Sequence, residues 1–382
     1  MRVYQVGGSI RDALLGLPVS DRDWVVVGAT AEQMGREGYL PVGKDFPVFL
    51  HPSTREEYAL ARTERKTARG YKGFAVHASP EVTLEEDLAR RDLTINAMAR
   101  GTDGALIDPF GGERDLRAGV LRHVSPAFAE DPVRILRVAR FAARFGFTIA
   151  PETAALMKTM VASGEADALV AERVWQEFAR GLMEKNPWRM LAELAQCGLL
   201  AKAYPALGIE AVGELPANAA SDLAARALGF AAKESYSLAV RFALVTRAAR
   251  ESLDRLEALC ESFKVPTECR DLALLAARHG SAAARAQHLA PRELLGLVEA
   301  CDAFRRPQRL EELMDVSEAE GNAARHWAQI PYPPRHATRS ALAAARHIDA
   351  AAVAAEGGDI GARIRAARYA NLLQTMGGAQ GR

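Results

Sequence analysis

The feature that most constrains the fold of this chain is a change in sequence pattern near residue 131. Before that point, short apolar runs alternate with glycines and short amphipathic segments, which predicts mixed α/β structure. After it, apolar residues recur at every third and fourth position, as in VRILRVARFAARF (133–145) and ERVWQEFARGLM (172–183). This spacing is typical of amphipathic helices. We therefore expect an α+β protein, in which a small N-terminal head with a mixed sheet and helices is followed by helices only.

Four apolar runs in the first part predict β-strands: 3–6, 24–27, 57–61 and 121–124. The run WVVV at 24–27 is apolar throughout, which is the pattern of a strand buried on both faces. A short helix is expected at 10–15, closed by Gly16, and a longer one at 84–98. From residue 131 to 382 we expect no strand.

The composition is that of an ordinary globular protein, with 49% hydrophobic and 25% charged residues. It excludes a disordered or fibrous chain, and the length of 382 residues suggests two or three packing units. The N-terminus lacks the pattern of a signal peptide and no long apolar run occurs, so we expect no membrane span. The four cysteines form no CxxC pair, which favours reduced thiols in a cytoplasmic protein over a zinc site.

The charged residues are unevenly distributed, although the formal net charge is only +1. That balance argues against a protein that coats nucleic acid non-specifically. The segment 62–72 nevertheless carries five basic residues against one glutamate, and we expect it to be a mobile basic loop outside the sheet. The segment 134–144 carries four arginines and no acidic residue. On a helix these four lie within an arc of about 120°.

Two aspartates, Asp21 and Asp23, stand directly before the strand expected at 24–27. In an extended segment, side chains two residues apart point to the same side. Like charges at that spacing repel, and a divalent cation relieves the repulsion; oxygen ligands favour Mg²⁺ or Mn²⁺. A lone DxD is more often a polar turn. Upstream, however, Gly7 and Gly8 follow a strand and begin a helix, which lets backbone amides approach a phosphate, and Arg11 can add a charged contact.

Further motifs lie downstream. In LARRDLTINA (88–97), Asp92 precedes Asn96 by four residues, which places both on one face of the expected helix, although a solvated helix face has the same spacing. DPFGG at 108–112 predicts a turn. Asp131 and Pro132 are suited to the start of the next helix, where aspartate caps and proline occupies the first turn.

The segments GGSIRD, DRD, RRDLTINA, DPFGG, EDPVRILRVARF and ERVWQEF follow one another in this order. With them the chain resembles the class II tRNA nucleotidyltransferases, densely from residue 1 to about 185. The resemblance implies a nucleotidyltransferase head of the DNA polymerase β type at 1–125. It further implies a helical neck with a base-recognition helix at 126–205, a helical body at 206–330, and a helical, tRNA-binding tail at 331–382.

The resemblance also implies roles for single residues of the head. Asp21 and Asp23 would hold the catalytic Mg²⁺, with Mn²⁺ as an alternative. Gly8 and Arg11 would contact the triphosphate, and Arg91 the incoming nucleotide. Asp92 would be catalytic, either as a ribose contact or as a third metal carboxylate.

In the neck, the resemblance implies that Asp131 and Arg134 form a protein template for the base, with Arg137 and Arg140 nearby. Glu172 and Arg173 would support the neck. A carboxylate accepts from an exocyclic amine and a guanidinium donates to ring nitrogens and carbonyls. Cytosine and adenine offer that pair of groups, whereas uracil and guanine present a carbonyl in place of the amine.

The implied activity is the addition of CMP, CMP and AMP to the 3′ end of tRNA from CTP and ATP. The partner is tRNA, bound through its 3′ end and its acceptor and T arms, and neither a membrane nor a protein partner is implied. A CC- or A-adding enzyme and a poly(A) polymerase remain alternatives, although residues 42–49 lack the GxRFxxxHV-type segment of the latter. A non-catalytic RNA-binding protein is a further alternative, against which the three aspartates argue.

Many relatives also carry a metal-dependent HD phosphohydrolase domain in the body, and here the chain departs from them. That chemistry needs an adjacent His-Asp pair and further histidines. The chain contains no His-Asp dipeptide and no histidine between His123 and His279. We therefore expect the HD region to be degenerate or deleted and phosphohydrolase activity to be absent.

Overall fold

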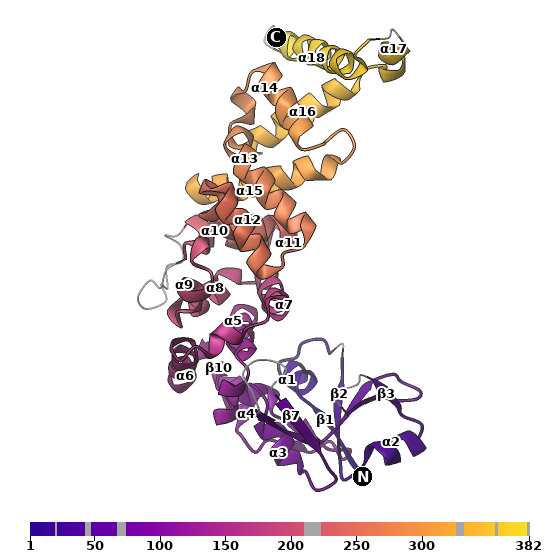
Figure 1. The fold of residues 1–382 in the computed structure, drawn as a ribbon, viewed down its shortest axis with the longest axis vertical. Helices are drawn as coiled ribbons and strands as arrows, with labels where there is room; N and C mark the ends of the chain where they lie inside the picture. The colour runs from indigo at the N-terminus through magenta and orange to yellow at the C-terminus, as the bar shows by residue number, and fades with distance from the viewer. Residues whose placement is uncertain are drawn as a thin grey trace. The chain divides into compact units, whose positions relative to one another are not determined.

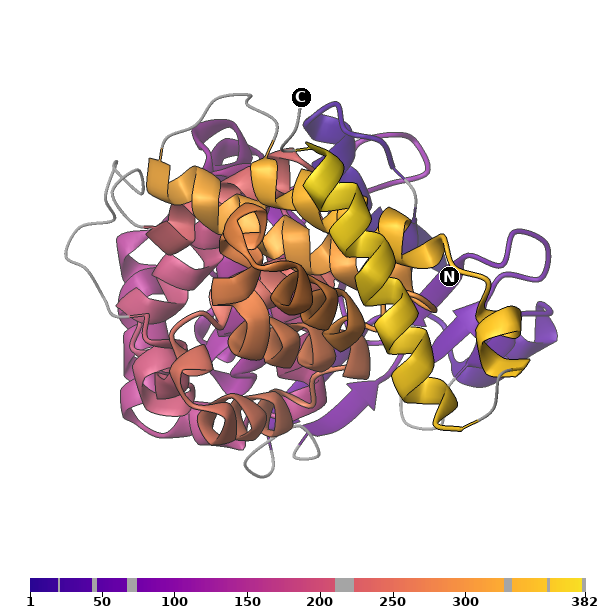
Figure 2. The same cartoon turned by 90° about the horizontal axis from the view of Figure 1, so that it is seen from above.

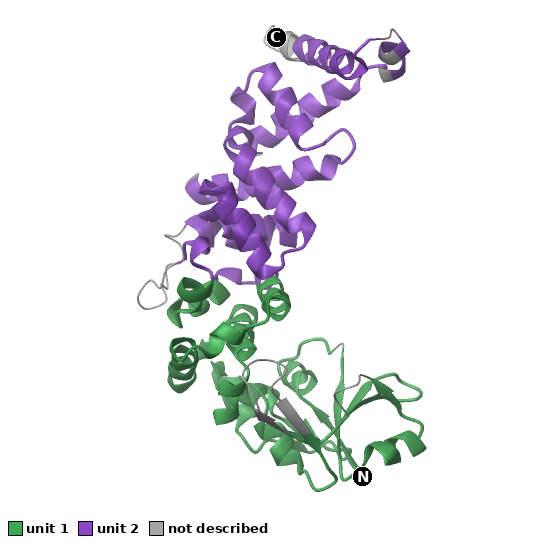
Figure 3. Ribbon diagram, viewed as in Figure 1, with its two compact units in different colours: residues 1–181, 189–203 green, residues 182–188, 204–382 purple. Residues whose placement is uncertain are grey.

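The computed structural model describes residues 1–19, 21–42, 47–66, 74–209, 223–325, 332–355 and 358–379. The chain forms two compact units, one of residues 1–181 with 189–203 and one of residues 182–188 with 204–382 (Figure 3). The domain boundaries expected at 125/126, 205/206 and 330/331 stay predictions.

The first unit contains a seven-stranded mixed sheet with the strand order β3-β4-β5-β2-β1-β8-β9 (Figure 1). Its strands are β1 (Arg2–Val6), β2 (Asp23–Val27), β3 (Leu40–Val42), β4 (Val48–Leu50), β5 (Glu57–Leu60), β8 (Ala99–Arg100) and β9 (Leu106–Ile107). Strand β2 pairs antiparallel with β1 and parallel with β5. The sheet and the helices that follow it confirm the α+β class.

Strand β2 is buried on both faces, as its apolar run predicts. Val25 and Val27 pack into one core with Leu88, and Val26 packs into another with Met34 and Phe49. Successive side chains of a strand point to opposite faces, so one short strand contributes to both cores. This burial holds the start of β2, where Asp23 lies, in a rigid part of the head.

The short helices of the head are α1 (Gly8–Leu14), α2 (Ala31–Arg36), α3 (Leu84–Ala89) and α4 (Gly112–Ala118). Thr30 and Thr83 begin α2 and α3 with reciprocal capping bonds to Gln33 and Glu86. The expectation of a helix over 84–98 is wrong beyond Ala89. There the Asp92 carboxylate accepts from the backbone N–H of Leu93, which competes with helical bonding, and a 3₁₀ turn follows at Thr94–Asn96.

The expectation of a loop over 62–72 is wrong for its first five residues. Arg62–Lys66 form strand β6, which pairs antiparallel with β7 (Phe74–Ala78) in a separate two-stranded sheet. Backbone pairing is indifferent to side-chain charge, so a basic segment can form a strand when a partner lies alongside. Residues 67–72 lie outside the described part of the chain.

The remainder of the first unit is helical except for one short strand. Its helices are α5 (Val133–Phe145), α6 (Pro151–Ala162), α7 (Ala171–Leu182), α8 (Pro187–Gln196) and α9 (Leu199–Ala203). The strand β11 (Thr148–Ile149) pairs parallel with β10 (Val120–Leu121), so the expectation of no strand after 131 is wrong at this point, and the strand expected at 121–124 is shorter. Two-residue strands leave no periodicity to detect in a sequence.

The second unit consists of helices over its described residues. They are α10 (Leu223–Lys233), α11 (Leu238–Val245), α12 (Leu253–Phe263), α13 (Thr267–Ala284), α14 (Pro291–Ala300), α15 (Pro307–Arg325), α16 (Pro333–Arg346), α17 (Ala350–Ala355) and α18 (Ile360–Ala379). Helices α10, α11, α13 and α15 pack on one another, and α18 runs across α14 and α16 (Figure 2). Among the described residues, no helix has the length and apolar character that a membrane span requires.

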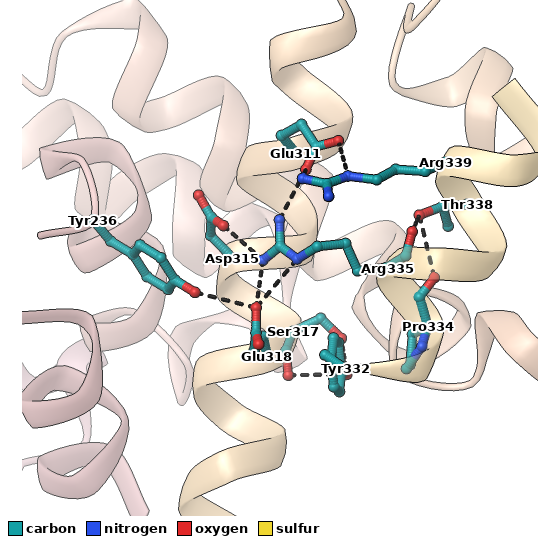
Figure 4. A network of polar contacts seen from close by, with 10 residues as sticks. All are labelled: Tyr236, Glu311, Asp315, Ser317, Glu318, Tyr332, Pro334, Arg335, Thr338 and Arg339. Atoms are coloured by element: carbon teal, nitrogen blue, oxygen red, sulfur yellow. Dashed lines mark hydrogen bonds and ion pairs between the residues drawn. The ribbon is translucent and has the colours of Figure 1, made fainter. Parts of the chain in front are cut away.

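A polar network joins α15 to α16 in this unit (Figure 4). The Arg335 guanidinium at the start of α16 donates to three carboxylates of α15, those of Glu311, Asp315 and Glu318, at 2.6–2.9 Å. These three acids recur at the spacing of one helix face. The Tyr236 hydroxyl, in the connection between α10 and α11, donates to Glu318 and so links this connection to the network.

Candidate active site

One cavity of about 700 Å³ in the first unit collects the residues to which the sequence assigned catalytic and nucleotide-binding roles. Its lining combines glycines of the α1 turn, aspartates of the head, and arginines that far outnumber those acids. The lining residues are Gly7, Gly8, Arg11, Asp21, Asp23, Arg62, Arg90, Arg91, Asp92, Asn96, Asp131, Arg134, Arg137, Arg140, Phe141, Arg144, Arg173 and Arg180. Such an excess of positive charge is suited to a polyanionic ligand.

The two carboxylates of the DRD segment lie at the start of β2. Asp23 is its first residue and Asp21 precedes it. Desolvation raises the pKa of Asp23 and the Asp21 charge raises it further, while Arg91 opposes the shift. Two carboxylates at the start of one strand are a donor set that fits Mg²⁺. Among the described residues no third acidic, histidine or cysteine side chain joins them in a metal-binding group.

Gly7 makes room for Arg91 beside these carboxylates. Its φ is +75°, and a Cβ there would lie 2.9 Å from Arg91 Nη1 and 4.0 Å from Asp23 Oδ2. Both the left-handed backbone and the close approach require glycine. The Arg91 head group therefore lies over the α1 turn at the edge of the cavity.

Arg11 is held by the protein on several sides. It is 4% exposed, donates to Asp12 and to Asn96, and packs against the rings of Phe141 and Phe145 on α5. Burial lowers the pKa of Arg11, and the Asp12 carboxylate opposes that shift. In its described contacts Arg11 ties α1 to α5, which no local pattern in the sequence indicated.

Asp92 is buried and makes three hydrogen bonds. It accepts from the backbone of Leu93, from Asn96 Nδ2 at 3.0 Å, and from Arg137 Nε at 2.7 Å. Burial by itself would raise the pKa of Asp92, but Arg137 and Asn96 hold it well below its usual range. The contact between Asp92 and Asn96 that the sequence predicted exists, although the two residues do not share a helix.

The arginines of α5 are held by a buried carboxylate on α7. Glu177, 5% exposed, accepts from Arg140 Nε at 2.5 Å and lies 3.7 Å from Arg137 Nη1. The Asp92 carboxylate and then Glu177 raise the pKa of Arg137 against the effect of burial. Glu177 was not among the residues predicted from the sequence, although it stands four residues after Arg173 and so on the same helix face.

The expected template residues lie where α5 begins. Asp131 Oδ1 accepts from the Val133 backbone N–H at 3.2 Å and so satisfies one donor of the first turn, whereas the N-cap position, expected at Asp131, is occupied by Pro132. It also accepts from both terminal nitrogens of Arg173, at 3.1 and 2.8 Å. Arg134 donates to the carbonyl oxygens of Ala127 and Arg90. Glu172 is not among the residues that line the cavity.

Comparison with known families matches two parts of the chain. A family described as the poly A polymerase head domain matches residues 3–122. A second, described as the probable RNA and SrmB-binding site of polymerase A, matches residues 146–208. The two matches cover the sheet with its short helices and the helices α6 to α9.

Similarity to curated proteins extends over the whole chain. It is 53% identical to the multifunctional CCA protein of Chromobacterium violaceum, covering 98% of each, and 52% identical to that of Burkholderia pseudomallei, covering 99% of each. A CCA-adding enzyme solved with CTP has a TM-score of 0.69 at 24% identity, covering 97% of this chain and 87% of that one. The Thermotoga maritima CCA-adding enzyme complexed with tRNA has a TM-score of 0.64 at 21% identity, covering 99% and 91%. At such identities the structures show a common fold.

Proposed function

The chain belongs to the family of multifunctional CCA proteins, and we propose that it adds CMP, CMP and AMP in turn to the 3′ end of tRNA, from CTP and ATP. The observation that carries the proposal is that one cavity unites the carboxylates of the DRD segment with the arginines of α5. A nucleoside triphosphate needs both, since its phosphates require cations and its base requires directed hydrogen bonds. The cytoplasmic location and the absence of a protein partner stay predictions.

In the proposed reaction the terminal 3′-hydroxyl of the tRNA attacks the α-phosphate of the nucleotide. A new P–O bond forms there, the bond to the β-phosphate oxygen breaks, and pyrophosphate leaves. Mg²⁺, or Mn²⁺ in its place, would be held by Asp21 and Asp23 and would stabilise charge on the attacking and leaving oxygens. Arg91, beside Asp23, is placed to bind the triphosphate. Gly8 and Arg11, which line the same cavity, are the further predicted contacts of the triphosphate.

We assign base recognition to Asp131 and Arg134. Asp131 presents a carboxylate that accepts from the exocyclic amine of cytosine or adenine, and Arg134 donates to ring acceptors. Arg137 and Arg140, fixed by Asp92 and Glu177, hold this part of α5 in place. Asp92, whose oxygens accept from Arg137 and Asn96, is assigned a catalytic role, either as a ribose contact or as a third metal carboxylate.

A tRNA that lacks CCA, supplied with CTP and ATP separately and together, tests the proposal. Full activity gives a product extended by two residues with CTP and by three with both nucleotides. A product that stops after CC, one that requires CC beforehand, or a long A tract would instead identify a CC-adding, an A-adding or a poly(A)-adding enzyme.

Replacement of Asp21 or Asp23 by alanine tests the metal site. Each variant is expected to lose about a thousandfold in addition rate, because the bound metal supplies several kcal/mol to the reaction, while tRNA binding stays near that of the unaltered protein. Glu32→Ala, an exposed carboxylate on α2, is the control and should leave the rate unchanged. If Asp21→Ala or Asp23→Ala retains more than about a few per cent of the rate in Mg²⁺, the assignment is wrong.

A further inference from the structure

A buried aspartate outside the predicted site lies directly behind Arg91. Asp87 on α3 has no exposed side-chain surface. Its Oδ1 accepts from Arg90 Nη2 at 2.7 Å and from the Arg62 backbone N–H at 3.3 Å. Its Oδ2 accepts from Arg91 Nη2 at 3.3 Å. One carboxylate thus contacts two adjacent arginines and the first residue of β6.

Arg91 depends on this contact. Among the described residues, Asp87 is the one hydrogen-bond acceptor of the Arg91 side chain, and the buried Arg91 Nε has none. An arginine side chain has several rotatable bonds, so without an anchor its head group would sample many positions. The contact with Asp87 holds the Arg91 head group in the position in which Arg91 Nη1 lies over Gly7, next to Asp23.

Asp87 also links Arg91 to two other parts of the cavity wall. Arg90, bound to the same carboxylate, donates to the Arg62 carbonyl oxygen at 3.1 Å, so the base of the β6–β7 hairpin is tied to α3. The Arg90 carbonyl oxygen accepts from Arg134 Nη2 at 2.6 Å. The Arg90 and Arg91 charges offset the effect of burial and keep the pKa of Asp87 below its usual value.

We infer that Asp87 is a positioning residue for the incoming nucleotide, which holds Arg91 against the triphosphate and fixes the base of the β6–β7 hairpin to the same point. This inference rests on the proposed function. Because Arg91 lies beside the metal-site carboxylates, loss of Asp87 affects the phosphate end of the nucleotide. CTP and ATP share that end, so KM should rise equally for both nucleotides and base choice should not change.

The test combines Asp87→Asn with Arg91→Gln in a double-mutant cycle, with KM and kcat measured separately for CTP and ATP. The amide of Asp87→Asn still accepts from Arg62 and Arg90, but its NH₂ group faces the Arg91 donor. Loss of one charge-assisted hydrogen bond predicts a rise in KM of about tenfold or more for both nucleotides. The ratio of CTP to UTP incorporation should not change. In the Arg91→Gln background, Asp87→Asn should add little, because the side chain through which it acts is gone.

Glu85→Gln is the matched control, since it removes the same charge from an exposed position of α3. Additive effects of Asp87→Asn and Arg91→Gln, or an unchanged KM in the single variant, would overturn the inference. If Asp87→Asn does not fold, Asp87→Glu replaces it, because glutamate keeps the charge and displaces the oxygens by one methylene. An unchanged KM in the folded Asp87→Glu variant would also overturn the inference. Absence of C and A addition by the unaltered protein would instead contradict the proposed function.

Discussion

At the scale of single residues, the arginines of the cavity differ in what holds them. Arg140 and Arg137 are bound to buried carboxylates, Glu177 and Asp92. Arg134 donates to backbone carbonyls. A guanidinium whose donors are fixed on one side presents the others in a defined direction, and directed donors are what recognition of a base edge needs.

Asp131→Asn tests whether the expected template residue reads the base. We expect the ratio of CTP to UTP incorporation at fixed tRNA to fall about tenfold, because an acceptor oxygen becomes a donor facing the cytosine amine. Asparagine also caps helices well, but the variant loses the paired contact with Arg173, so its melting temperature should fall modestly.

The matched control for this experiment is Arg173→Met, which removes the same ion pair and leaves the Asp131 carboxylate in place. It should lower the melting temperature as much as Asp131→Asn and change the nucleotide ratio less. Equal loss of selectivity in both variants would show that the ion pair, not the base contact, determines the choice.

At the scale of elements, one partly buried cation of α16, Arg335, pairs with acids of α15. Its side chain is 15% exposed, and it bonds to three carboxylates of α15 (Figure 4). Hydrogen bonds from Arg339 and Arg335 lower the pKa of Glu311, whereas burial raises that of Asp315 against the effect of Arg335. Removal of the cation would leave the acids to repel one another next to a helix start.

Arg335→Met should destabilise the second unit by about 3 kcal/mol at neutral pH, the typical effect of breaking a buried ion pair. Without Arg335 the folded-state pKa values of Glu311 and Asp315 rise, so the deficit is complete where these groups are ionised and shrinks as the pH falls through those raised values. Thermal unfolding of both proteins across this pH range measures the difference. Arg339→Met, at a 59% exposed side chain, should cost less than about 1 kcal/mol; an equal effect would contradict the role of burial.

At the scale of the whole molecule, the curated relatives contain residues that this chain lacks. The alignment with the Chromobacterium violaceum protein extends over 401 positions, whereas the chain has 382 residues. A cavity of about 640 Å³ in the second unit is lined by Arg247, Arg250 and Glu320 among others, and no histidine occurs among its described lining residues. The Arg250 guanidinium pairs with Glu320 there.

We therefore predict that the protein does not hydrolyse 2′,3′-cyclic AMP. Metal-dependent phosphohydrolysis needs imidazole and carboxylate ligands, and guanidinium groups repel divalent cations. The measurement is hydrolysis by pure protein with Ni²⁺ or Co²⁺ added, beside CCA addition as proof that the sample is active. Robust metal-stimulated hydrolysis would contradict the prediction and would indicate a metal-dependent phosphohydrolase site in the region 220–290.

Features that depend on neighbours along the chain could be predicted from the sequence alone. The continuous apolar run of β2 placed this strand between two cores, the DRD spacing placed two carboxylates at its start, and the period of α5 put its arginines on one face. Only the tertiary structure decided which acids meet those arginines. Asp92 reaches Arg137 across 45 residues, and Glu177 reaches Arg140 across 37. Local propensity carries no information about such partners, because a buried ion pair forms only where packing brings its two halves together. In two other segments the local pattern did not hold: the helix expected over 84–98 ends at Ala89, where the Asp92 carboxylate binds the Leu93 N–H, and the basic residues 62–66 pair with β7.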